Sequence, residues 1–396
     1  MDRFIYLDNA ATTKTSPEVI EAMRPYFGEL FGNPASAYTF AGNINSDVDR
    51  ARKEIAGFIN ASADEIYFTS GGSESDNWAL KGTAFALKNK GKHIITTVIE
   101  HHAILNACDY LERSGYDVTY LSVDENGLIS LEELKAAIRP DTILISVMFA
   151  NNEIGTIEPI AEIGRIAHEH GILFHTDAVQ AYGHIPIDVK HLGIDMLSVS
   201  GHKINAPKGI GFLYIRKGIK IEPLIHGCSQ ERGKRGGTTN VAGIIGLAKA
   251  TELAAESLDK RAEYERELRD YLIGRIENEI PYALLNGDRS KRLPNNVNFC
   301  FRFIEGESML LLLDQYGICA SSGSACTSGS LDPSHVLLAI GRPHEIAHGS
   351  LRLTLSEETR KDDIDFTVDT LKQIIERLRS MSPLYEDFIR EKRTGA

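Results

Sequence analysis

Short apolar runs alternate with longer amphipathic segments between about residues 50 and 250. The runs have the length and composition of buried strands, and they cover residues 64–69, 93–97, 118–121, 143–147, 172–175 and 196–199. Segments between them, such as residues 131–138 and 160–170, have helical spacing. Strands that alternate with helices indicate βαβ crossovers around a mainly parallel sheet. The sequence therefore predicts an α/β fold with a mainly parallel central sheet.

The pattern changes after about residue 255, where a long charged helix is predicted over Glu252 to Glu279. Short strand-like runs at residues 296–301, 317–320 and 351–355 follow, then a final amphipathic helix over Thr359 to Met381 and a polar tail. A chain of 396 residues exceeds what one hydrophobic core usually supports. We therefore expect a large domain of residues 14–257, and a smaller α+β domain of residues 1–13 and 258–396.

The charge of the chain limits its partners. A formal net charge of −12 disfavours a nucleic acid or an anionic membrane surface as partner. The first residues contain no charged leader before a long apolar stretch, and no apolar run reaches the length that spans a bilayer. We expect a cytoplasmic protein that binds neither nucleic acid nor membrane.

The five cysteines are odd in number and lack CxxC spacing, so neither a disulfide framework nor a zinc site is expected. A histidine-rich stretch over His168 to His175 passes from a helix end into a strand, so its side chains should diverge and bind no metal. Cys326 lies among Ser, Gly and Ala residues, which indicates a mobile loop and a candidate nucleophile. The other four cysteines, Cys319 included, are expected to serve packing.

Two chemically distinctive side chains follow predicted strands. Lys203 comes just after the apolar run 194–199, and Asp177 closes the run that begins at Ile172. Ligands of such sheets bind at the carboxyl ends of the strands. A lysine and an acid there suit the Schiff base of pyridoxal phosphate (PLP) and the partner of its pyridinium nitrogen. Taken singly, Asp177 could cap the next helix and Lys203 could be a surface lysine, and many PLP reactions remain open.

A glycine pair follows the first predicted strand. Gly71, Gly72 and Ser73 lead into a helix, whose free N–H groups could hold a phosphate. A tight turn with a serine cap is an equal alternative. The run Gly227 to Arg235 superficially resembles a P-loop but has five residues between its glycines, arginine where Ser or Thr is needed, and no preceding strand. ATP and NAD are therefore not expected.

Motifs spread over nearly the whole chain point to one family. They are Tyr6 to Thr13, Gly32 to Pro34, Glu100-His101, Asn151 to Gly155, Asp177 to Gln180, Ser200 to Lys203, Gln230 to Gly233, Ser321 to Cys326, Arg352 and Ser382 to Tyr385. With these motifs the chain resembles the PLP-dependent cysteine desulfurases of the NifS/IscS type, which have the fold-type I, aspartate aminotransferase-like fold. It departs from the usual pattern at Tyr38, Gly72-Ser73, 227–230 and 236–240.

The resemblance implies a role for each matching position in cofactor binding. Lys203 would hold PLP and later transfer protons, Asp177 would pair with the ring nitrogen, and His101 would stack on the ring and assist proton transfer. Either Gln180 or Asn152 would contact the ring hydroxyl. The residues implied for the phosphate are Gly72, Ser73, Ser200 and His202, with Thr238 from the other subunit of a homodimer.

The resemblance also implies the reaction. Arg352, with Asn152 nearby, would bind the carboxylate of L-cysteine, for which a guanidinium is well suited. Cys326 would take the sulfur as a persulfide while L-alanine leaves, and the sulfur would supply iron–sulfur cluster assembly through a NifU/IscU-like scaffold protein or another acceptor. Residues 381–388 resemble the scaffold-docking segment, although Pro383 could simply stop the last helix.

Other functions remain possible from the sequence. A selenocysteine lyase, an aminotransferase, a sulfur donor for tRNA thiolation and a binding protein without catalysis are the alternatives. The segment with Cys326 disfavours an aminotransferase, which needs no mobile thiol.

Overall fold

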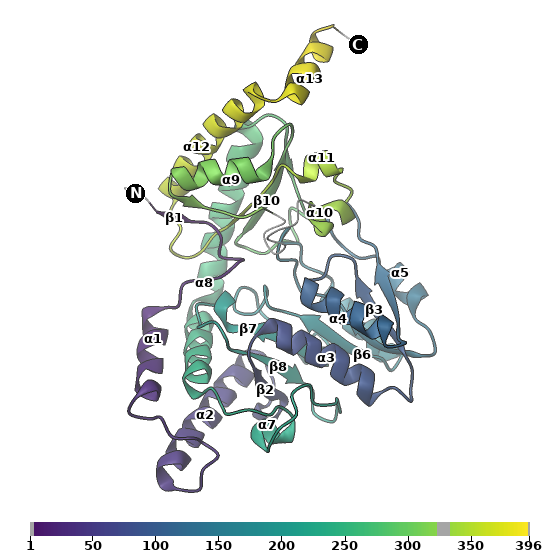
Figure 1. Cartoon of the computed structure of the whole chain (residues 1–396), viewed down its shortest axis with the longest axis vertical. Coiled ribbons are helices and arrows are strands. Elements are labelled where there is room, and N and C mark those ends of the chain that lie inside the picture. Colours follow the sequence, from purple (N-terminus) through teal and green to yellow (C-terminus); the bar gives the residue numbers. More distant parts are fainter. Residues whose placement is uncertain (1–3, 323–332, 395–396) are drawn as a thin grey trace.

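The computed structural model describes residues 4–322 and 333–394. Within them, one sheet has seven strands in the order β2-β8-β7-β6-β5-β3-β4 (Figure 1). The strands are β2 (Ile66–Thr69), β3 (His93–Thr97), β4 (Asp117–Leu121), β5 (Thr142–Ser146), β6 (Leu173–Asp177), β7 (Met196–Ser200) and β8 (Gly211–Ile215). Neighbours from β4 through to β7 are parallel, which confirms the predicted α/β class. No strand was predicted at β8, which lies antiparallel between β2 and β7.

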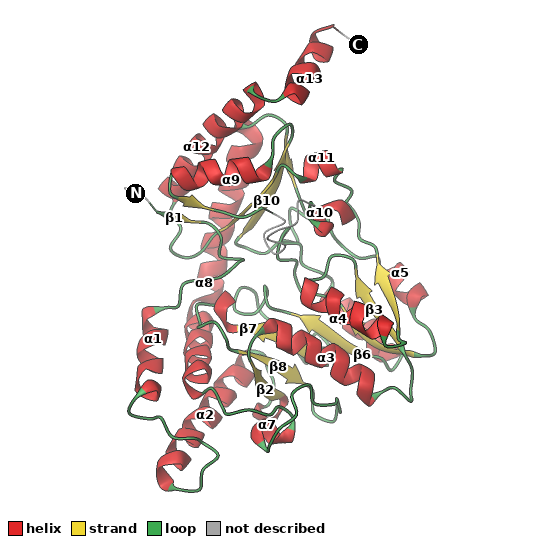
Figure 2. Cartoon of the chain, viewed as in Figure 1, coloured by secondary structure: helices red, strands yellow, loops and turns green. Residues whose placement is uncertain are grey.

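Helices cover both faces of this sheet (Figure 2). One face packs against α3 (Gly72–Ala86) and α4 (His102–Arg113), and the other packs against α2 (Thr39–Phe58) and α6 (Ile160–Glu169). Alternate strand residues divide between the two cores: Leu213 joins the α3 side, whereas Phe212 and Tyr214 join the α2 side. Because both faces are buried, the strands are apolar throughout, which is why their positions were readable from the sequence.

Shorter helical elements complete this part of the chain. They are α1 (Pro17–Met23), α5 (Leu131–Ala137), α7 (Gln230–Gly233) and the 3-10 turns η1 (Arg24–Phe27), η2 (Ala63–Glu65) and η3 (Gly201–Lys203). The turn η3 directly follows β7, so Lys203 lies just beyond the carboxyl end of that strand.

Helix α8 (Val241–Glu279) is 39 residues long and runs from the seven-stranded sheet to the second sheet (Figure 1). The predicted start at Glu252 is wrong by eleven residues. The first turns contain Gly243, Gly246 and several alanines and are buried, so they lack the charged face by which the helix was recognised. Asn240 caps the true start, where its Oδ1 accepts the N–H of Gly243 at 3.1 Å.

The second sheet is antiparallel, in the order β12-β10-β9, and a separate parallel pair joins β1 to β11. These strands are β1 (Ile5–Tyr6), β9 (Ala283–Leu285), β10 (Asn296–Phe301), β11 (Ile318–Cys319) and β12 (Ser350–Thr354). The helices around them are α9 (Gly306–Gln315), α10 (His335–Ala339), α11 (His344–Ala347), α12 (Lys361–Ser380) and α13 (Pro383–Thr394).

The second sheet has its own hydrophobic core, which includes Ile5 and Leu7 from the start of the chain. Because this core is separate, we propose that the chain divides into two domains, residues 14–257 and residues 1–13 with 258–396. The proposed boundary after residue 257 falls inside α8, so one continuous helix belongs to both parts.

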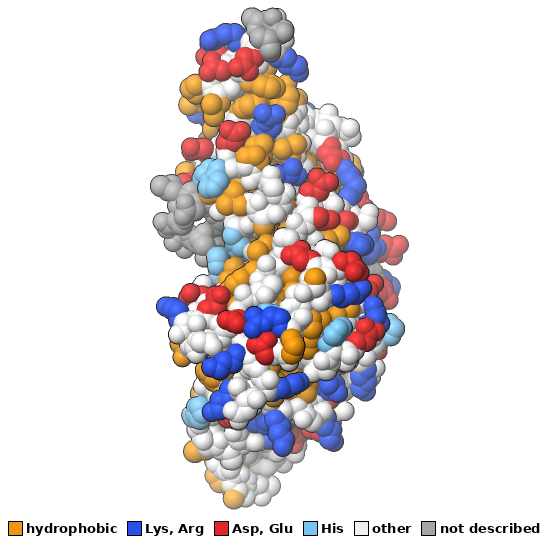
Figure 3. Space-filling view, turned by 90° about the vertical axis from the view of Figure 1, so that its right-hand side faces the viewer, with side chains coloured by type: hydrophobic (Ala, Val, Ile, Leu, Met, Phe, Trp, Pro, Cys, Tyr) orange, Lys and Arg blue, Asp and Glu red, His pale blue; other side chains and the backbone are white. Residues whose placement is uncertain are grey.

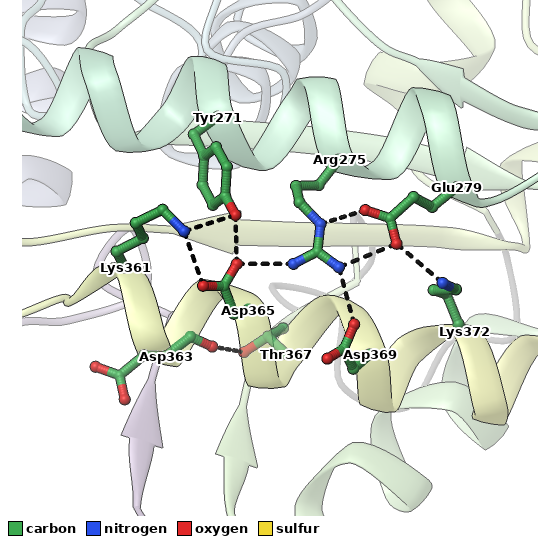
Figure 4. Close-up of polar contacts among 9 residues, drawn as sticks. All are labelled: Tyr271, Arg275, Glu279, Lys361, Asp363, Asp365, Thr367, Asp369 and Lys372. Carbon is green, nitrogen blue, oxygen red and sulfur yellow. Dashed lines mark hydrogen bonds and ion pairs between the residues drawn. The ribbon is translucent and has the colours of Figure 1, made fainter.

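An ion-pair network joins α12 to α8 (Figure 4). Arg275 of α8 donates to Asp365 at 2.7 Å and to Asp369 at 2.8 Å, both on α12. Lys372 of α12 donates back to Glu279 of α8 at 2.9 Å. Because several charges share partners, this network fixes the two helices better than isolated surface pairs would.

Residues 383–394 form helix α13, whereas the sequence predicted a polar tail without a further helix. Pro383 begins α13 and does not merely stop α12, because proline lacks only an N–H that the first turn of a helix leaves unpaired anyway. Phe388 of α13 lies 5.3 Å from the ring of Tyr282 and 4.8 Å from that of Phe303. Apolar side chains remain visible at this end of the molecule (Figure 3), where Met381 is 70% and Leu384 is 62% exposed.

The cysteines within the described residues only partly meet expectation. Cys108 and Cys300 are buried and Cys319 is half-buried, but Cys228 is exposed because it lies in a polar, glycine-containing loop. Packing is therefore the wrong interpretation for Cys228. Among the described residues no cluster of side chains could hold a metal ion. In the same part of the chain, no helix has both the length and the apolar composition needed to cross a bilayer.

Candidate active site

A cavity of about 560 Å³ opens at the carboxyl ends of β6 and β7. Most of the predicted site residues line it: Gly72, Ser73, His101, Asn152, Asp177, Gln180, Ser200, His202, Lys203 and Arg352. Two predicted residues are not among them. Thr238 lies on an exposed loop, and Cys326 is outside the described residues.

Lys203 meets the beginning of the chain. Its Nζ donates to the carbonyl oxygens of Ala10 at 2.5 Å and Ala11 at 2.8 Å. The side chain of Gln180 donates to the same Ala10 oxygen at 3.1 Å. The segment after β1 therefore forms one wall of the cavity.

Asp177 is the last residue of β6 and is buried. Its Oδ1 accepts the N–H of Val179 at 2.9 Å. Burial raises the pKa of this carboxyl to about 6, against the opposing effects of the Val179 N–H and the charge of Lys203. A cation placed beside Asp177 would favour its ionised form.

The glycine turn gives the backbone close access to the cavity. Gly71 has φ = 148° and precedes the first residue of α3, Gly72. A Cβ on Gly72 would lie 2.7 Å from Cγ2 of Val179, so a larger residue there would require Val179 to shift. The N-terminus of α3 then faces the cavity beside Ser73 and Ser200, which suits an anion.

Two histidines of the cavity are neutral. Burial, followed by the charges of Lys203 and His102, lowers the pKa of His101 to about 4. Burial, followed by Lys203 and Lys208, likewise lowers that of His202 to about 4. Because Nδ1 of His101 accepts the N–H of Ala103 at 3.1 Å, the ring proton resides on Nε2.

Arg352 lies on β12 of the second sheet and lines the cavity. It donates through Nη1 to the carbonyl oxygen of Asn152 at 3.0 Å and through Nη2 to Asp8 at 2.9 Å. No functional role was predicted for Asp8, or for Asp76 and Lys208, which line the cavity. Asp8 lies within the motif Tyr6 to Thr13, but a sequence does not reveal which distant residue it contacts.

Comparison with known proteins agrees with this geometry. Residues 5–366 match the model of the family "Aminotransferase class-V". The chain is 58% identical to "Cysteine desulfurase IscS" of Clostridium botulinum (strain Hall) over 394 residues, which are 99% of each chain. This chain belongs to the cysteine desulfurases of the class-V aminotransferase family.

Solved structures of such proteins are also similar. A "NIFS-LIKE PROTEIN" is 39% identical with a TM-score of 0.89, over 94% of this chain and 100% of that one. "SspA in complex with cysteine" is 39% identical with a TM-score of 0.79, over 89% of this chain and 99% of that one. The predicted resemblance, fold and enzyme class of this desulfurase are therefore confirmed. The family depends on PLP, whereas the roles of individual site residues stay predictions.

Proposed function

We propose that this chain removes sulfur from L-cysteine, releases L-alanine and passes the sulfur to Cys326 as a persulfide. The observation that carries the proposal is the meeting of Lys203, Asp177 and Arg352 in one cavity, within a chain so similar to named cysteine desulfurases. The amine would bind a cofactor, the acid would tune it and the guanidinium would bind an amino acid's carboxylate.

The residues of the cavity fit PLP. A volume of about 560 Å³ is in the range of small-molecule sites. Lys203 would hold the cofactor covalently, Asp177 would face the ring nitrogen, and Gln180 or Asn152 would contact the ring hydroxyl. The phosphate would lie against Gly72, Ser73, Ser200 and His202. When bound, PLP supplies an electron sink for the carbanion at the substrate Cα.

Lys203 is the residue that we assign to proton transfer at the substrate Cα. His101 is less suited to accept a proton, because Nδ1 is occupied by the N–H of Ala103 and Nε2 carries the ring proton. The imidazole can still donate a hydrogen bond from Nε2. We therefore give His101 a positioning and donating role, with Lys203 as the base.

Cys326 is assigned from the family resemblance, and described residues on either side of it support the assignment. Ser321 pairs with Arg352 through two backbone hydrogen bonds, of 3.2 and 2.6 Å. After the segment, Ser334 donates to the carboxylate of Glu153, which follows Asn152 in the sequence. Both flanking residues therefore contact neighbours of the proposed substrate site.

A single-turnover experiment tests the proposal. The purified protein, loaded with PLP, is incubated with one equivalent of L-cysteine, and peptides are weighed by mass spectrometry. We expect one L-alanine per active site and the added mass of one sulfur atom on the peptide that contains Cys326. Cys326→Ser should abolish the addition and Cys319→Ser should leave it unchanged. Alanine formation at the wild-type rate in Cys326→Ser would contradict the proposal.

The reaction partner of the persulfide is a further part of the proposal. An iron–sulfur scaffold protein is the acceptor that the family resemblance suggests. A cavity of about 1410 Å³ is lined by residues of α9, α11 and α13 and by Ser321 and Ser334, which flank the segment with Cys326. Purified scaffold protein should bind the full chain, and Leu384→Asp should weaken that binding. Unchanged binding would exclude this docking site.

The homodimer and the role of Thr238 also belong to the proposal. The exposure of Thr238 suits a residue that reaches a neighbouring subunit. Sedimentation should give a dimer, and Thr238→Ala should weaken PLP binding in it, whereas Thr239→Ala should not.

A comparison of selenide with sulfide release tests the selenocysteine lyase alternative.

A further inference from the structure

A row of polar side chains crosses the sheet beneath the cavity. Ser146 of β5, His175 of β6 and Ser198 of β7 are fully buried. Nδ1 of His175 lies 2.9 Å from Oγ of Ser146, and Nε2 lies 2.9 Å from Oγ of Ser198. Buried polar groups are costly in such a core unless each finds a partner, so a row of three is a specific feature.

The row lies on the sheet face that α3 covers, and it leads to Asp177. His175 and Asp177 are two residues apart on β6, so their side chains share a face. Ser198 is the register partner of Asp177 in the β6–β7 ladder. The row and the acid of the proposed cofactor site therefore form one continuous polar group.

Helix α3 adds a second acid to this group. Asp76 is 1% exposed, lines the cavity and has Oδ1 3.8 Å from Nε2 of His175. This Oδ1 has no hydrogen-bond partner among the described residues. Nothing in the proposed reaction uses Asp76, although its carboxyl borders the cofactor site.

No cation in the row would balance an ionised Asp76. Burial lowers the pKa of His175 to about 3, so its imidazole is neutral. Lys203 acts on Asp177, and the third nearby acid, Glu100, is buried as well, and burial raises its own pKa well above the ordinary value. Burial first, then Asp177, raises the pKa of Asp76 well above its ordinary value, whereas a hydrogen bond with Ser198 lowers it and Glu100 raises it. Two acids that share a site with low polarity do not both ionise readily.

We propose that Asp76 is a positioning residue for the cofactor: its carboxyl is unionised at neutral pH, which leaves Asp177 as the ionised group that faces the ring nitrogen. This inference rests on the proposed function, because it needs PLP in the cavity. It sets the direction of the hydrogen bonds: Asp76 donates to Ser198, Ser198 donates to Nε2 of His175, and Nδ1–H donates to Ser146. A neutral imidazole, with one donor and one acceptor nitrogen, permits this direction.

Infrared spectroscopy of the protein without PLP tests the charge of Asp76 directly. The spectrum of wild type minus that of Asp76→Asn at pH 7 should contain the C=O band of one unionised carboxylic acid, shifted in D₂O. Thr83→Val, which removes another buried polar group from α3, should retain the band. Loss of carboxylate bands in Asp76→Asn would overturn the proposal. If that variant does not fold, Ser198→Ala should shift the same band, and an unshifted band would overturn the proposal.

Binding of PLP to the protein without cofactor tests the consequence. Asn resembles an unionised acid, so Asp76→Asn should bind PLP within about twofold of wild type at pH 7. Asp76→Leu lacks the donor and should bind roughly tenfold more weakly, the order of one lost hydrogen bond. Equal weakening in both variants would overturn the proposal. Failure of wild type to bind PLP would instead refute the proposed function, while the infrared result would still decide the charge of Asp76.

Discussion

Arg352, which lines the cavity, forms an ion pair with Asp8, with Nη2 2.9 Å from Oδ1 and side chains that are only 3% and 18% exposed. The pair therefore neutralises the guanidinium before a substrate arrives, while the buried Nε has no acceptor among the described residues.

The first prediction concerns this pair. Arg352→Gln should raise KM for L-cysteine by about 100-fold, because a buried charge-assisted contact is worth roughly 2 to 5 kcal/mol. Asp8→Asn should lower KM severalfold while it destabilises the protein, because Arg352 then lacks its anion until substrate binds. Steady-state kinetics and denaturant unfolding measure both effects, and Arg139→Gln on the surface is the control. A higher KM in Asp8→Asn would mean that Asp8 orients Arg352 and does not compete with substrate.

The second prediction concerns His101. Because burial lowers its pKa to about 4, the imidazole stays neutral at and above about pH 5, and kcat/KM should show no limb from His101 near pH 6.5. His101→Gln keeps a donor and should be more active than His101→Ala, with the wild-type profile. An acid limb near pH 6.5 that disappears in His101→Gln would show that His101 is the base.

The third prediction concerns Glu153, which is 5% exposed. Burial raises its pKa from 4.5 to about 7, while Ser334 and Arg352 oppose the rise. Because the folded state favours the unionised form, Glu153 contributes its full stabilisation of the fold below pH 4.5. This contribution is lost as pH rises to about 7. The unfolding free energy of wild type should fall relative to Glu153→Gln by about 1.4 kcal/mol per pH unit in that window. Urea titrations from pH 4.5 to 8 measure it, and a constant difference would refute the assignment.

The fourth prediction concerns the network between α8 and α12. The Arg275 hydrogen bond, ahead of that from Lys372, lowers the pKa of Glu279 to about 2. A lowered acid pKa stabilises the fold above its ordinary value of 4.5 and loses that effect as pH falls toward 2. Arg275→Gln should therefore cost about 1 kcal/mol at pH 7 and less at pH 3 or in 1 M salt. Arg165→Gln, which breaks a single exposed pair, should cost less, and equal losses would mean that the network adds nothing.

Much of the fold was predictable because the parallel strands are buried on both faces, so each appears as an apolar run. β8 is equally apolar, but it pairs antiparallel without a crossover helix and so has no place in a βαβ pattern. The early turns of α8 were missed for a related reason. Gly246 lets that helix pack closely against Met23 and Pro207, and the buried first turns lack the charged face by which a helix is recognised from its sequence.

The site was predictable where a chemically distinctive side chain lies at or just after the end of a recognisable strand, as Asp177 and Lys203 do. Asp76 lies in the first turns of α3, where an acid usually interacts favourably with the positive end of the helix dipole. Its burial against His175 could therefore not be foreseen. Asp8 meets Arg352 across 344 residues of sequence, and no local pattern reports such a contact.

The number of residues in helix α8 determines how the two parts of the site face each other. Lys203 follows the first sheet and Arg352 belongs to the second, and α8 spans the distance between the sheets without interruption. Each residue in a helix adds about 1.5 Å and a turn of about 100°. One codon gained or lost in the middle of α8 would rotate the two halves of the site out of alignment, although many single replacements on its exposed surface would leave them facing each other. Substitutions on the exposed surface of α8 should therefore be tolerated far more readily than insertions or deletions within it.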